Sequence, residues 1–304
     1  MTFSKQSTPG GHLRAIRISI QINNIKRDKL VIIITFYLII TFHLFLVDTN
    51  IKHISVIEIY NMASTEQQQP IDDFVSGLVS VIIPSYNRYV LLNHSIRSVL
   101  ANTYKNVEVI VINDCSTDQR YYSGELEKYE KTTVIHLPEN MRVKHKVPAA
   151  QGMTRNYGIE KARGEWIAFL DDDDFYLDYK IEKQLEVMKN ENILFSTTNM
   201  YMINHHSVSM DKLDINTLTL HNSNEQENKI FNLKMITEHN HIANSTVIIH
   251  HSIVKKTGAQ RIVRGAEDWD YWKRALQYTD CLYISEPLVY YTWTIQDSMN
   301  TRYY

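Results

Sequence analysis

The sequence has few cysteines, little net charge and none of the usual glycine-rich phosphate-binding motifs. Cys115 and Cys281 are its only cysteines, too few for a disulfide framework or a zinc site. The net charge is −2 and no basic stripe with interleaved aromatics occurs, so nothing indicates a nucleic-acid-binding surface. Neither G-x-x-x-x-G-K-[ST] nor a G-x-G-x-x-G after the first predicted strand is present. Any phosphate group would therefore be held by a metal ion and by arginine.

The N-terminal part differs in composition from the rest of the 304 residues. Residues 1–29 form a polar, basic tail, and residues 30–47 are uncharged and long enough to cross a bilayer as a helix. Basic residues precede this segment and Asp48 follows it, so we expect a cytosolic N-terminus and a catalytic part across the membrane. Residues 48–76 would then be a linker to a folded domain over residues 77–304.

A second interpretation starts the protein at Met62. Residues 62–66 resemble an ordinary protein start, and a polar, glutamine-rich stretch leads from them to the first predicted strand. In that case the apolar segment is not translated and the protein is cytoplasmic. A signal peptide fits less well, because the apolar run is long and no small-residue cleavage site follows it.

From residue 77 onwards, apolar runs alternate with stretches of helical periodicity. The pattern predicts strands at 78–84, 107–112, 133–137, 164–170 and 247–249, and helices near 91–100, 121–129 and 149–162. Such alternation is typical of an α/β fold, with a parallel sheet and helices on both of its faces.

Polar side chains follow three of these strands. Tyr86 follows the first, Asp114 the second, and four aspartates, Asp171 to Asp174, the fourth. Because the carboxyl ends of parallel strands meet at one edge of a sheet, we expect these residues to converge there. Mg²⁺ or Mn²⁺ bridging to phosphate oxygens would relieve the repulsion among the carboxylates, although a solvated acidic turn is the alternative. Arg155 is the leading candidate for a phosphate contact, its alternative being a surface salt bridge.

These residues resemble the family 2 glycosyltransferases, which have a GT-A fold: a Rossmann-like, mostly parallel sheet flanked by helices, with an acceptor-side C-terminal portion. Four motifs in order carry the resemblance. They are Val79–Arg88, Val111–Asp118, Arg155–Ile159 with Gly164–Asp174, and Gly265–Trp272, the third of which includes a D-x-D motif and the fourth an E-D motif.

The resemblance implies a role for each matching residue. Tyr86 would stack on the nucleotide base, Asp114 would bind its edge and Asp171 would face the ribose. The nucleotide-sugar site would consist of Pro84, Tyr86, Asn87, Arg88, Asp114, Arg155, Asp171 and Asp172. Asp173 would ligate Mn²⁺ or Mg²⁺, with Asp174 as the alternate ligand.

The E-D motif supplies the catalytic residues in this resemblance. Asp268 would be the general base that deprotonates an acceptor hydroxyl, with Glu267 beside it. The enzyme would transfer a hexosyl or N-acetylhexosaminyl group with inversion, from a nucleotide-sugar (a UDP-sugar is favoured) to a glycan, lipid or protein. Residues 77–175 would form its nucleotide-binding half and residues 176–304 its acceptor and catalytic half.

The sequence also departs from the family pattern. Asn113 and Cys115 replace the usual Asp and Gly of the second motif, and Cys115 matters if its φ must be positive. Residues 258–261 lack the usual Gly-Gly-Phe-Asp, and residues 290–293 stand where many members carry an Arg and a His that contact the diphosphate or metal. Gln296 or Asp297 could replace that contact.

Residues 197–263 should build the acceptor side, but their pattern names neither sugar nor acceptor. Their histidines fit no standard zinc spacing and are interpreted as surface or capping residues: His205, His206, His239, His241, His250 and His251. Trp269 and Trp293 are candidates to stack on sugars, whereas the helical spacing of Trp272 from Asp268 favours a core position.

Three other functions fit the sequence less well. An EF-hand is rejected because Phe175 and Tyr176 stand where a ligand and a glycine are required, and because a strand pattern precedes the aspartates. A sugar nucleotidyltransferase would carry a Gly- and Lys/Arg-rich loop after its first strand, and residues 84–88 are not such a loop. A non-catalytic glycan-binding relative would have no need to keep two separate acidic sites.

Overall fold

The computed structural model describes residues 74–204, 218–263 and 266–293. The basic tail, the apolar segment 30–47, most of the linker, Gln296 and Asp297 lie outside the described residues, as do His205 and His206. In the described ranges no helix has the length and apolar character that crossing a bilayer requires.

The first half of the domain follows the predicted strand–helix alternation. Its elements are β1 Val75–Ser85, α3 Tyr89–Ala101, β2 Val107–Asn113, β3 Thr132–His136, α4 Met141–His145, α5 Gln151–Lys161 and β4 Gly164–Phe169. Strand β1 pairs in parallel with β2 and β4, and β2 with β3, as predicted. The helix predicted near 121–129 is wrong: two short 3-10 turns, Gln119–Tyr122 and Leu126–Lys128, occupy this stretch.

The second half continues the same sheet with mixed strand directions. Its elements are β5 Phe175–Tyr176, α6 Lys180–Asn190, β6 Phe195–Asn204, β7 Thr219–Leu220, β8 Lys229–Phe231, α7 Leu233–Glu238, β9 Ile248–His250, α8 His251–Thr257, α9 Glu267–Ala275 and β10 Cys281–Trp293. The strand order is β3-β2-β1-β4-β9-β6-β10-β5, with β7 beside β6 and β8 beside β10. The sheet is mostly parallel. It is nevertheless mixed, because β9 runs antiparallel to both β4 and β6.

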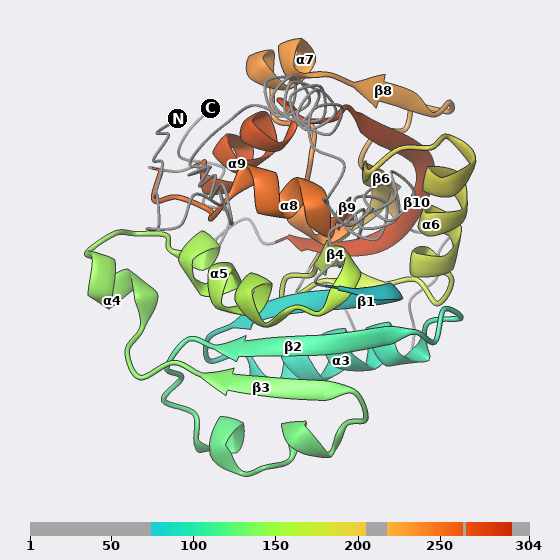
Figure 1. Cartoon of the computed structure of the whole chain (residues 1–304). Helices are drawn as coiled ribbons and strands as arrows, with labels where there is room; N and C mark the ends of the chain where they lie inside the picture. Colours follow the sequence, from blue (N-terminus) through green and yellow to red (C-terminus); the bar gives the residue numbers. More distant parts are fainter. Residues whose placement is uncertain (1–73, 205–217, 264–265, 294–304) are drawn as a thin grey trace, which may run out of the picture. The chain divides into compact units, whose positions relative to one another are not determined.

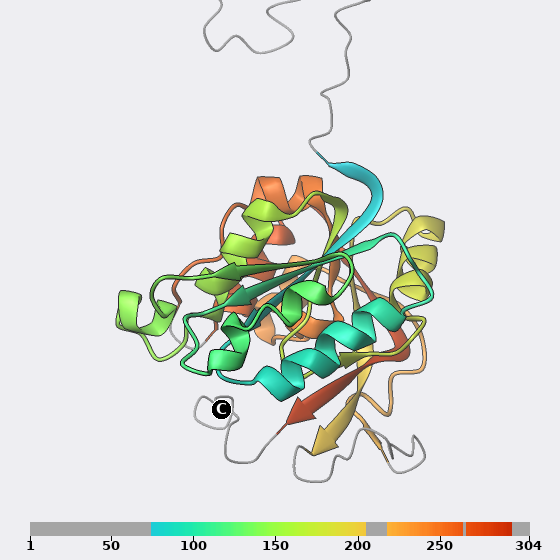
Figure 2. The same ribbon diagram turned by 90° about the horizontal axis from the view of Figure 1, so that it is seen from below.

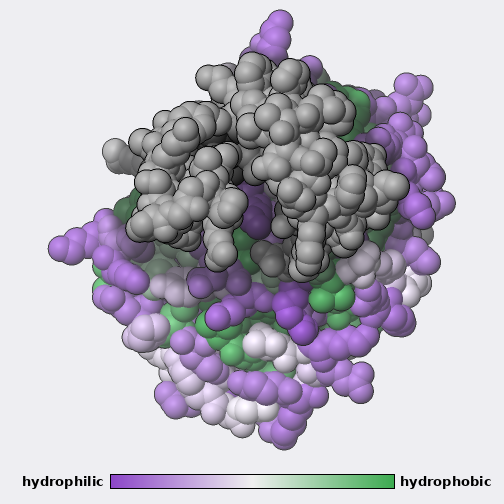
Figure 3. All heavy atoms as spheres, viewed as in Figure 1, coloured by the Kyte–Doolittle hydropathy of each residue, from purple (hydrophilic) through white to green (hydrophobic). Residues whose placement is uncertain are grey.

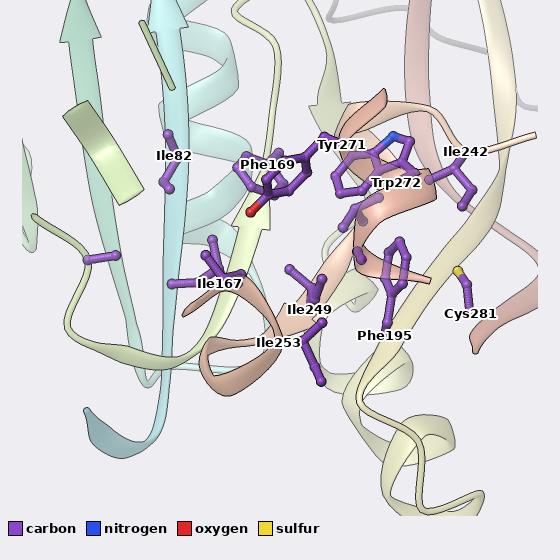
Figure 4. Packing of buried hydrophobic residues seen from close by; sticks show 14 of the residues in the cluster. Ile82, Ile167, Phe169, Phe195, Ile242, Ile249, Ile253, Tyr271, Trp272 and Cys281 are labelled. Atoms are coloured by element: carbon purple, nitrogen blue, oxygen red, sulfur yellow. The ribbon is translucent and has the colours of Figure 1, made fainter. Parts of the chain in front are cut away.

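Each face of the sheet carries its own hydrophobic core because side chains alternate along the central strands. In β1, Val81 and Ile83 face one core and Ile82 faces the other. Helices α3 and α6 cover the first, and α5, α8 and α9 the second; Figures 1 and 2 show α3 and α5 on opposite sides of β1 and β2. In the second core Trp272 packs against Phe169 and Phe195 (Figure 4), so its predicted core position is confirmed.

The acidic run begins where β4 leaves the sheet. Asp174 N–H donates to the Asp171 carbonyl (3.1 Å) and closes a turn, after which β5 pairs antiparallel with β10. Strand β4 precedes the aspartates, which agrees with the rejection of an EF-hand. The carboxyl ends of β1, β2 and β4 therefore bring their loops to one edge of the sheet.

Candidate active site

The loop after β1 is bonded directly to the acidic turn. Ser85 Oγ donates to Asp172 Oδ2 (2.6 Å) and is also bonded to the Tyr121 hydroxyl (2.5 Å). Arg88 Nη1 lies 3.3 Å from Asp172 Oδ1 and 2.5 Å from Asp173 Oδ2. Burial, with the charge of Asp173, raises the pKa of Asp172 to about 7, and Arg88 opposes this rise. Asp172 therefore joins the two loops.

Asp174 points into the protein. Its side chain accepts hydrogen bonds from Ser245 Oγ and from Thr292 N–H (2.8 Å), and only 1% of the residue is exposed. Burial and the charges of Asp173 and Asp171 raise its pKa well above the usual value. The side chains of Asp171 and Asp173 are instead 32% and 23% exposed. The run thus splits into two carboxylates that face inward and two that line the surface.

The loop after β2 is held in shape by its own polar contacts. Cys115 has φ 58°, so the residue that replaces the family glycine does occupy the left-handed region. Asn87, with φ 54°, accepts hydrogen bonds from Thr117 N–H (2.9 Å) and Asp118 N–H (3.2 Å). Its side chain therefore links the loops after β1 and β2. Beside it, 42% of Tyr86 is exposed.

Asp114 is largely occupied by contacts within the protein. Its carboxylate accepts hydrogen bonds from Met141 N–H (2.8 Å) and Asn140 Nδ2 (3.1 Å), and these attach α4 to this loop. Burial raises its pKa and the bond from Met141 opposes the rise. Pro84 lies buried in β1, in register with Ile112. Of the predicted nucleotide contacts in these two loops, Tyr86, Asn87 and Arg88 are exposed, whereas Pro84 and Asp114 are buried.

Arg155 on α5 bonds the acidic turn and is acted on by the charges of the E-D motif. Its Nη2 donates to Asp171 Oδ1, and only 2% of the residue is exposed. Burial by itself lowers the pKa of the guanidinium, but the charges of Asp171, Glu267 and Asp268 raise it. Its Nε and Nη1 have no hydrogen-bond partner in the described part of the chain. Arg155 does form a salt bridge, with Asp171, but this is not the surface salt bridge of the alternative interpretation, because the arginine side chain is buried.

Asp268 lies in the first turn of α9. Its Oδ1 accepts a hydrogen bond from the backbone N–H of the neighbouring Trp269 (2.7 Å), and its Oδ2 accepts one from Asn240 Nδ2 (3.2 Å). Burial, followed by the charge of Glu267, raises its pKa to about 6, against the hydrogen bonds and the charge of Arg155. A carboxylate with this pKa is deprotonated at neutral pH yet basic enough to accept a proton. Trp269 donates its indole N–H to the Ile236 carbonyl.

Tyr291 on β10 is a site residue that the motifs did not assign. Thr292, the next residue, bonds Asp174, and Tyr291 packs against the core beneath β1 and β4. Burial, and then the charges of Asp174, Asp171, Asp173 and Asp268, raise the pKa of its phenol. The charges of both acidic motifs thus act on the phenol of Tyr291. Its only signal in the sequence was its place after the E-D motif, where the family carries other side chains.

The structure brings most of the predicted residues to one edge of the sheet. It also adds five that sequence reasoning did not assign to the site, namely Ser85, Tyr121, Asn240, Ser245 and Tyr291. No group of three or more metal-ligating side chains forms among the described residues. Asp171 and Asp173 nevertheless offer the oxygen donors that Mg²⁺ and Mn²⁺ prefer, so they fit a metal that a diphosphate also ligates.

The predicted histidines have several environments. His250 accepts Ser252 N–H (3.1 Å) at the start of α8, so its capping role is confirmed. His251 Nδ1 lies 3.0 Å from the Gly164 carbonyl, and His239 and His241 are exposed on either side of Asn240.

On the face seen in Figure 1, the described surface is mainly hydrophilic with small, separate hydrophobic areas (Figure 3).

Comparison with known proteins places this site in context. The model of the family described as glycosyl transferase family 2 matches residues 80–254. An uncharacterized glycosyltransferase of Rickettsia conorii is 38% identical over 144 residues, 47% of this chain and 22% of the relative. The Escherichia coli UDP-Glc:alpha-D-GlcNAc-diphosphoundecaprenol beta-1,3-glucosyltransferase WfaP is 35% identical over 125 residues, 41% of this chain and 47% of the relative. The chain therefore spans less than half the length of these curated relatives.

A solved structure shares the fold. The crystal structure of S. aureus TarS 1–349 in complex with UDP-GlcNAc matches with a TM-score of 0.55 and 20% sequence identity. The match covers 74% of this chain and 61% of that one. At this identity the likeness establishes the architecture alone.

Proposed function

Because this chain belongs to glycosyl transferase family 2, we propose that it transfers a sugar from a nucleotide-sugar to an acceptor hydroxyl. The observation that carries the proposal is that buried Arg155 bonds Asp171 of the acidic turn while the charges of Glu267 and Asp268 also act on it. Two acidic motifs, almost a hundred residues apart, thus share one buried cation. Such an arrangement suits a donor phosphate on one side and a reacting hydroxyl on the other.

A UDP-sugar is the proposed donor. TarS has been crystallised with UDP-GlcNAc and WfaP is named for UDP-Glc, which supports a uridine donor for this chain. The exposed Tyr86 would stack on the base, and the loop organised by Asn87 and Asp114 would border it. Asp171 would face the ribose, and Arg155 would contribute to binding the diphosphate.

Asp173, with Asp171 nearby, would hold Mn²⁺ or Mg²⁺ together with the donor diphosphate. Bound there, the metal would stabilise negative charge on the leaving nucleoside diphosphate. Arg88 pairs with Asp173 and would have to share or release this carboxylate. Asp174 fits a ligand role less well, because Ser245 and Thr292 already use its oxygens.

The proposed chemistry is a single displacement with inversion. Asp268 accepts the proton of the acceptor hydroxyl while the oxygen of that hydroxyl attacks the anomeric carbon. The bond from that carbon to the diphosphate oxygen breaks, and the electron pair leaves with the nucleoside diphosphate. Arg155 opposes the rise in the pKa of Asp268 that burial and the charge of Glu267 cause. The acceptor is a glycan, lipid or protein hydroxyl, and residues 30–47, if translated, would anchor the enzyme in a membrane.

The test is metal-dependent release of a nucleoside diphosphate. The full chain, in detergent, is incubated with a panel of nucleotide-sugars with Mn²⁺ or with EDTA, and UDP binding is measured by calorimetry. We expect release from one donor only with Mn²⁺, and its loss together with Mn²⁺-dependent UDP binding in Asp173→Ala. The matched control Asp178→Ala alters an exposed aspartate of the next turn and should keep both activities.

Two results would contradict the proposal. Folded protein that releases nothing and binds UDP equally well in EDTA would favour the non-catalytic glycan-binding relative. Formation of UDP-sugar from UTP and a sugar 1-phosphate would favour the nucleotidyltransferase. Asp268→Asn separates the steps, since it should abolish transfer and leave UDP binding intact.

A further inference from the structure

Gln260, in the segment between α8 and α9, is a buried polar residue that the proposed mechanism does not use. Only 2% of it is exposed, and its Oε1 and Nε2 both lack a hydrogen-bond partner in the described part of the chain. A buried amide without a partner is costly, so it calls for a reason. The usual Gly-Gly-Phe-Asp of the family has an apolar phenylalanine at this position, so the amide is particular to this chain.

The backbone of Gln260 is fixed from two sides. On α5, Asn156 Oδ1 accepts a hydrogen bond from Gln260 N–H (2.8 Å), and Asn156 Nδ2 donates one to the Gln260 carbonyl (2.9 Å). On α9, Arg274 donates to the carbonyls of Thr257 (2.6 Å) and Ala259 (3.0 Å), which precede Gln260 in the chain. The side chain therefore starts from a fixed point, and its own torsions decide what its amide contacts.

The Gln260 amide and the Glu267 side chain border the same space above Gly152. A Cβ at Gly152 would lie 2.8 Å from Gln260 Oε1 and 3.1 Å from Glu267 Cγ. The Glu267 carboxylate is attached to this Cγ, so side-chain rotation can bring it to hydrogen-bonding distance from the amide. A half-turn of the terminal amide, about a torsion with a broad energy profile, exchanges Oε1 for Nε2 and turns a donor towards Glu267.

We propose that Gln260 is a positioning residue of the E-D motif, and that its Nε2 donates a hydrogen bond which holds the Glu267 carboxylate beside Asp268. Gln260 is too deeply buried to touch a substrate, so it acts only through Glu267. The charge of Glu267 acts on Asp268, and the place of this carboxylate therefore affects the general base. A hydrogen bond to a charged acceptor is stronger than one between neutral groups, and this bond would also satisfy the buried amide.

The catalytic consequence rests on the proposed function, whereas the hydrogen bond can be tested without any substrate. The experiment is a double-mutant cycle in urea on the full chain in detergent. Gln260→Met and Glu267→Met each keep the length of the side chain and remove its hydrogen bonding. If Gln260→Met does not fold, the shorter Gln260→Leu replaces it in the same cycle.

The sign of the shift in the urea midpoint decides the result. In the otherwise native chain Gln260→Met breaks the bond, and we expect the midpoint to fall by about 0.5 M. In the Glu267→Met background the amide has lost its acceptor, so the same replacement should raise the midpoint. A rise of equal size in both backgrounds would show that the two side chains do not interact and would overturn the proposal.

The kinetic test asks whether the bond serves the reaction. Because Gln260 does not touch the substrate, Gln260→Met should lower kcat about ten-fold and leave KM and Mn²⁺-dependent UDP binding unchanged. In the Glu267→Met background it should have no further effect on kcat. An unchanged kcat, or a change confined to KM, would overturn the positioning role. The control Gln277→Met, in the exposed turn after α9, should change neither these parameters nor the urea midpoint.

Failure of the proposed function would be visible on the same samples. If no nucleotide-sugar supports transfer and UDP does not bind with Mn²⁺, the proposed function is wrong. The urea cycle would still decide whether Gln260 holds Glu267.

Discussion

At Asp268, burial and hydrogen bonding act in opposite directions on one proton. Burial and the charge of Glu267 raise the pKa to about 6, while the Trp269 N–H, Arg155 and Asn240 stabilise the charged form. The result is a carboxylate that titrates just below neutral pH, where a general base is most effective. Adjacent residues, Glu267 and Trp269, and the distant residues Arg155 and Asn240 thus together set its pKa.

The pH dependence of transfer should report this balance. Because the base must be deprotonated, we expect kcat/KM to fall about ten-fold per pH unit below pH 6. Asn240→Ala removes a hydrogen bond to the charged carboxylate, which raises the pKa and moves the acid limb upward by roughly half a unit to one unit. Transfer rates from pH 5 to 8 measure both. An unmoved limb in Asn240→Ala would mean that this bond does not tune the base.

Among the elements, α5 is constrained at two glycines that face different neighbours. At Gly158 a Cβ would lie 2.6 Å from Ile82 Cγ2 and 2.8 Å from Ile112 Cδ1, both in the sheet core. At Gly152 a Cβ would lie 2.8 Å from Gln260 Oε1 and 3.1 Å from Glu267 Cγ. The same helix is therefore fitted to the sheet at one turn and to Gln260 and Glu267 at another.

Alanine at these two positions should have different consequences. Both substitutions gain the same helix propensity, about 1 kcal/mol. Gly158→Ala overpacks buried isoleucines, which costs about 1–3 kcal/mol and should lower the urea midpoint. Gly152→Ala meets the flexible end of Gln260, so we expect little loss of stability but reduced kcat through displacement of Glu267. Urea unfolding and turnover of both variants provide the check, and a stabilised Gly158→Ala would refute the packing argument.

For the whole molecule, one continuous sheet joins the two halves. Strand β9, from the second half, pairs with β4 of the first and with β6. The Asp174 side chain is held by Ser245 and by Thr292, 118 positions away. The boundary predicted at residue 175 therefore crosses a shared sheet and shared hydrogen bonds.

This continuity predicts cooperative unfolding. Far-UV circular dichroism and tryptophan fluorescence should show the same urea midpoint, because neither half keeps its core without the other. Trp166→Phe removes the one tryptophan of the first half and leaves Trp269, Trp272 and Trp293, so its fluorescence reports on the second half. Its midpoint by the two methods should still agree. Separate transitions would show that the nucleotide-binding half unfolds independently.

The sequence determined the first half of the fold and the approximate position of the site. Apolar runs bounded by turn residues set β1 to β4 to within three residues at each end, since strand formation depends on local pattern. The acidic and polar residues after these strands then had to meet at one edge of a parallel sheet. The sequence left open whether Cys115 must adopt a positive φ, and the structure gives it a φ of 58°.

Only the tertiary structure decided how identical side chains divide their roles. Asp171 to Asp174 are alike in sequence, yet Asp172 and Asp174 turn inward to Ser85 and Ser245, 87 and 71 positions away. The antiparallel position of β9 and the bond from Asn240 to Asp268 likewise depend on packing between distant segments. Local pattern fixes which residues can form a strand or hold a charge. Burial and partner choice depend on long-range contacts, and these set the pKa of each carboxylate.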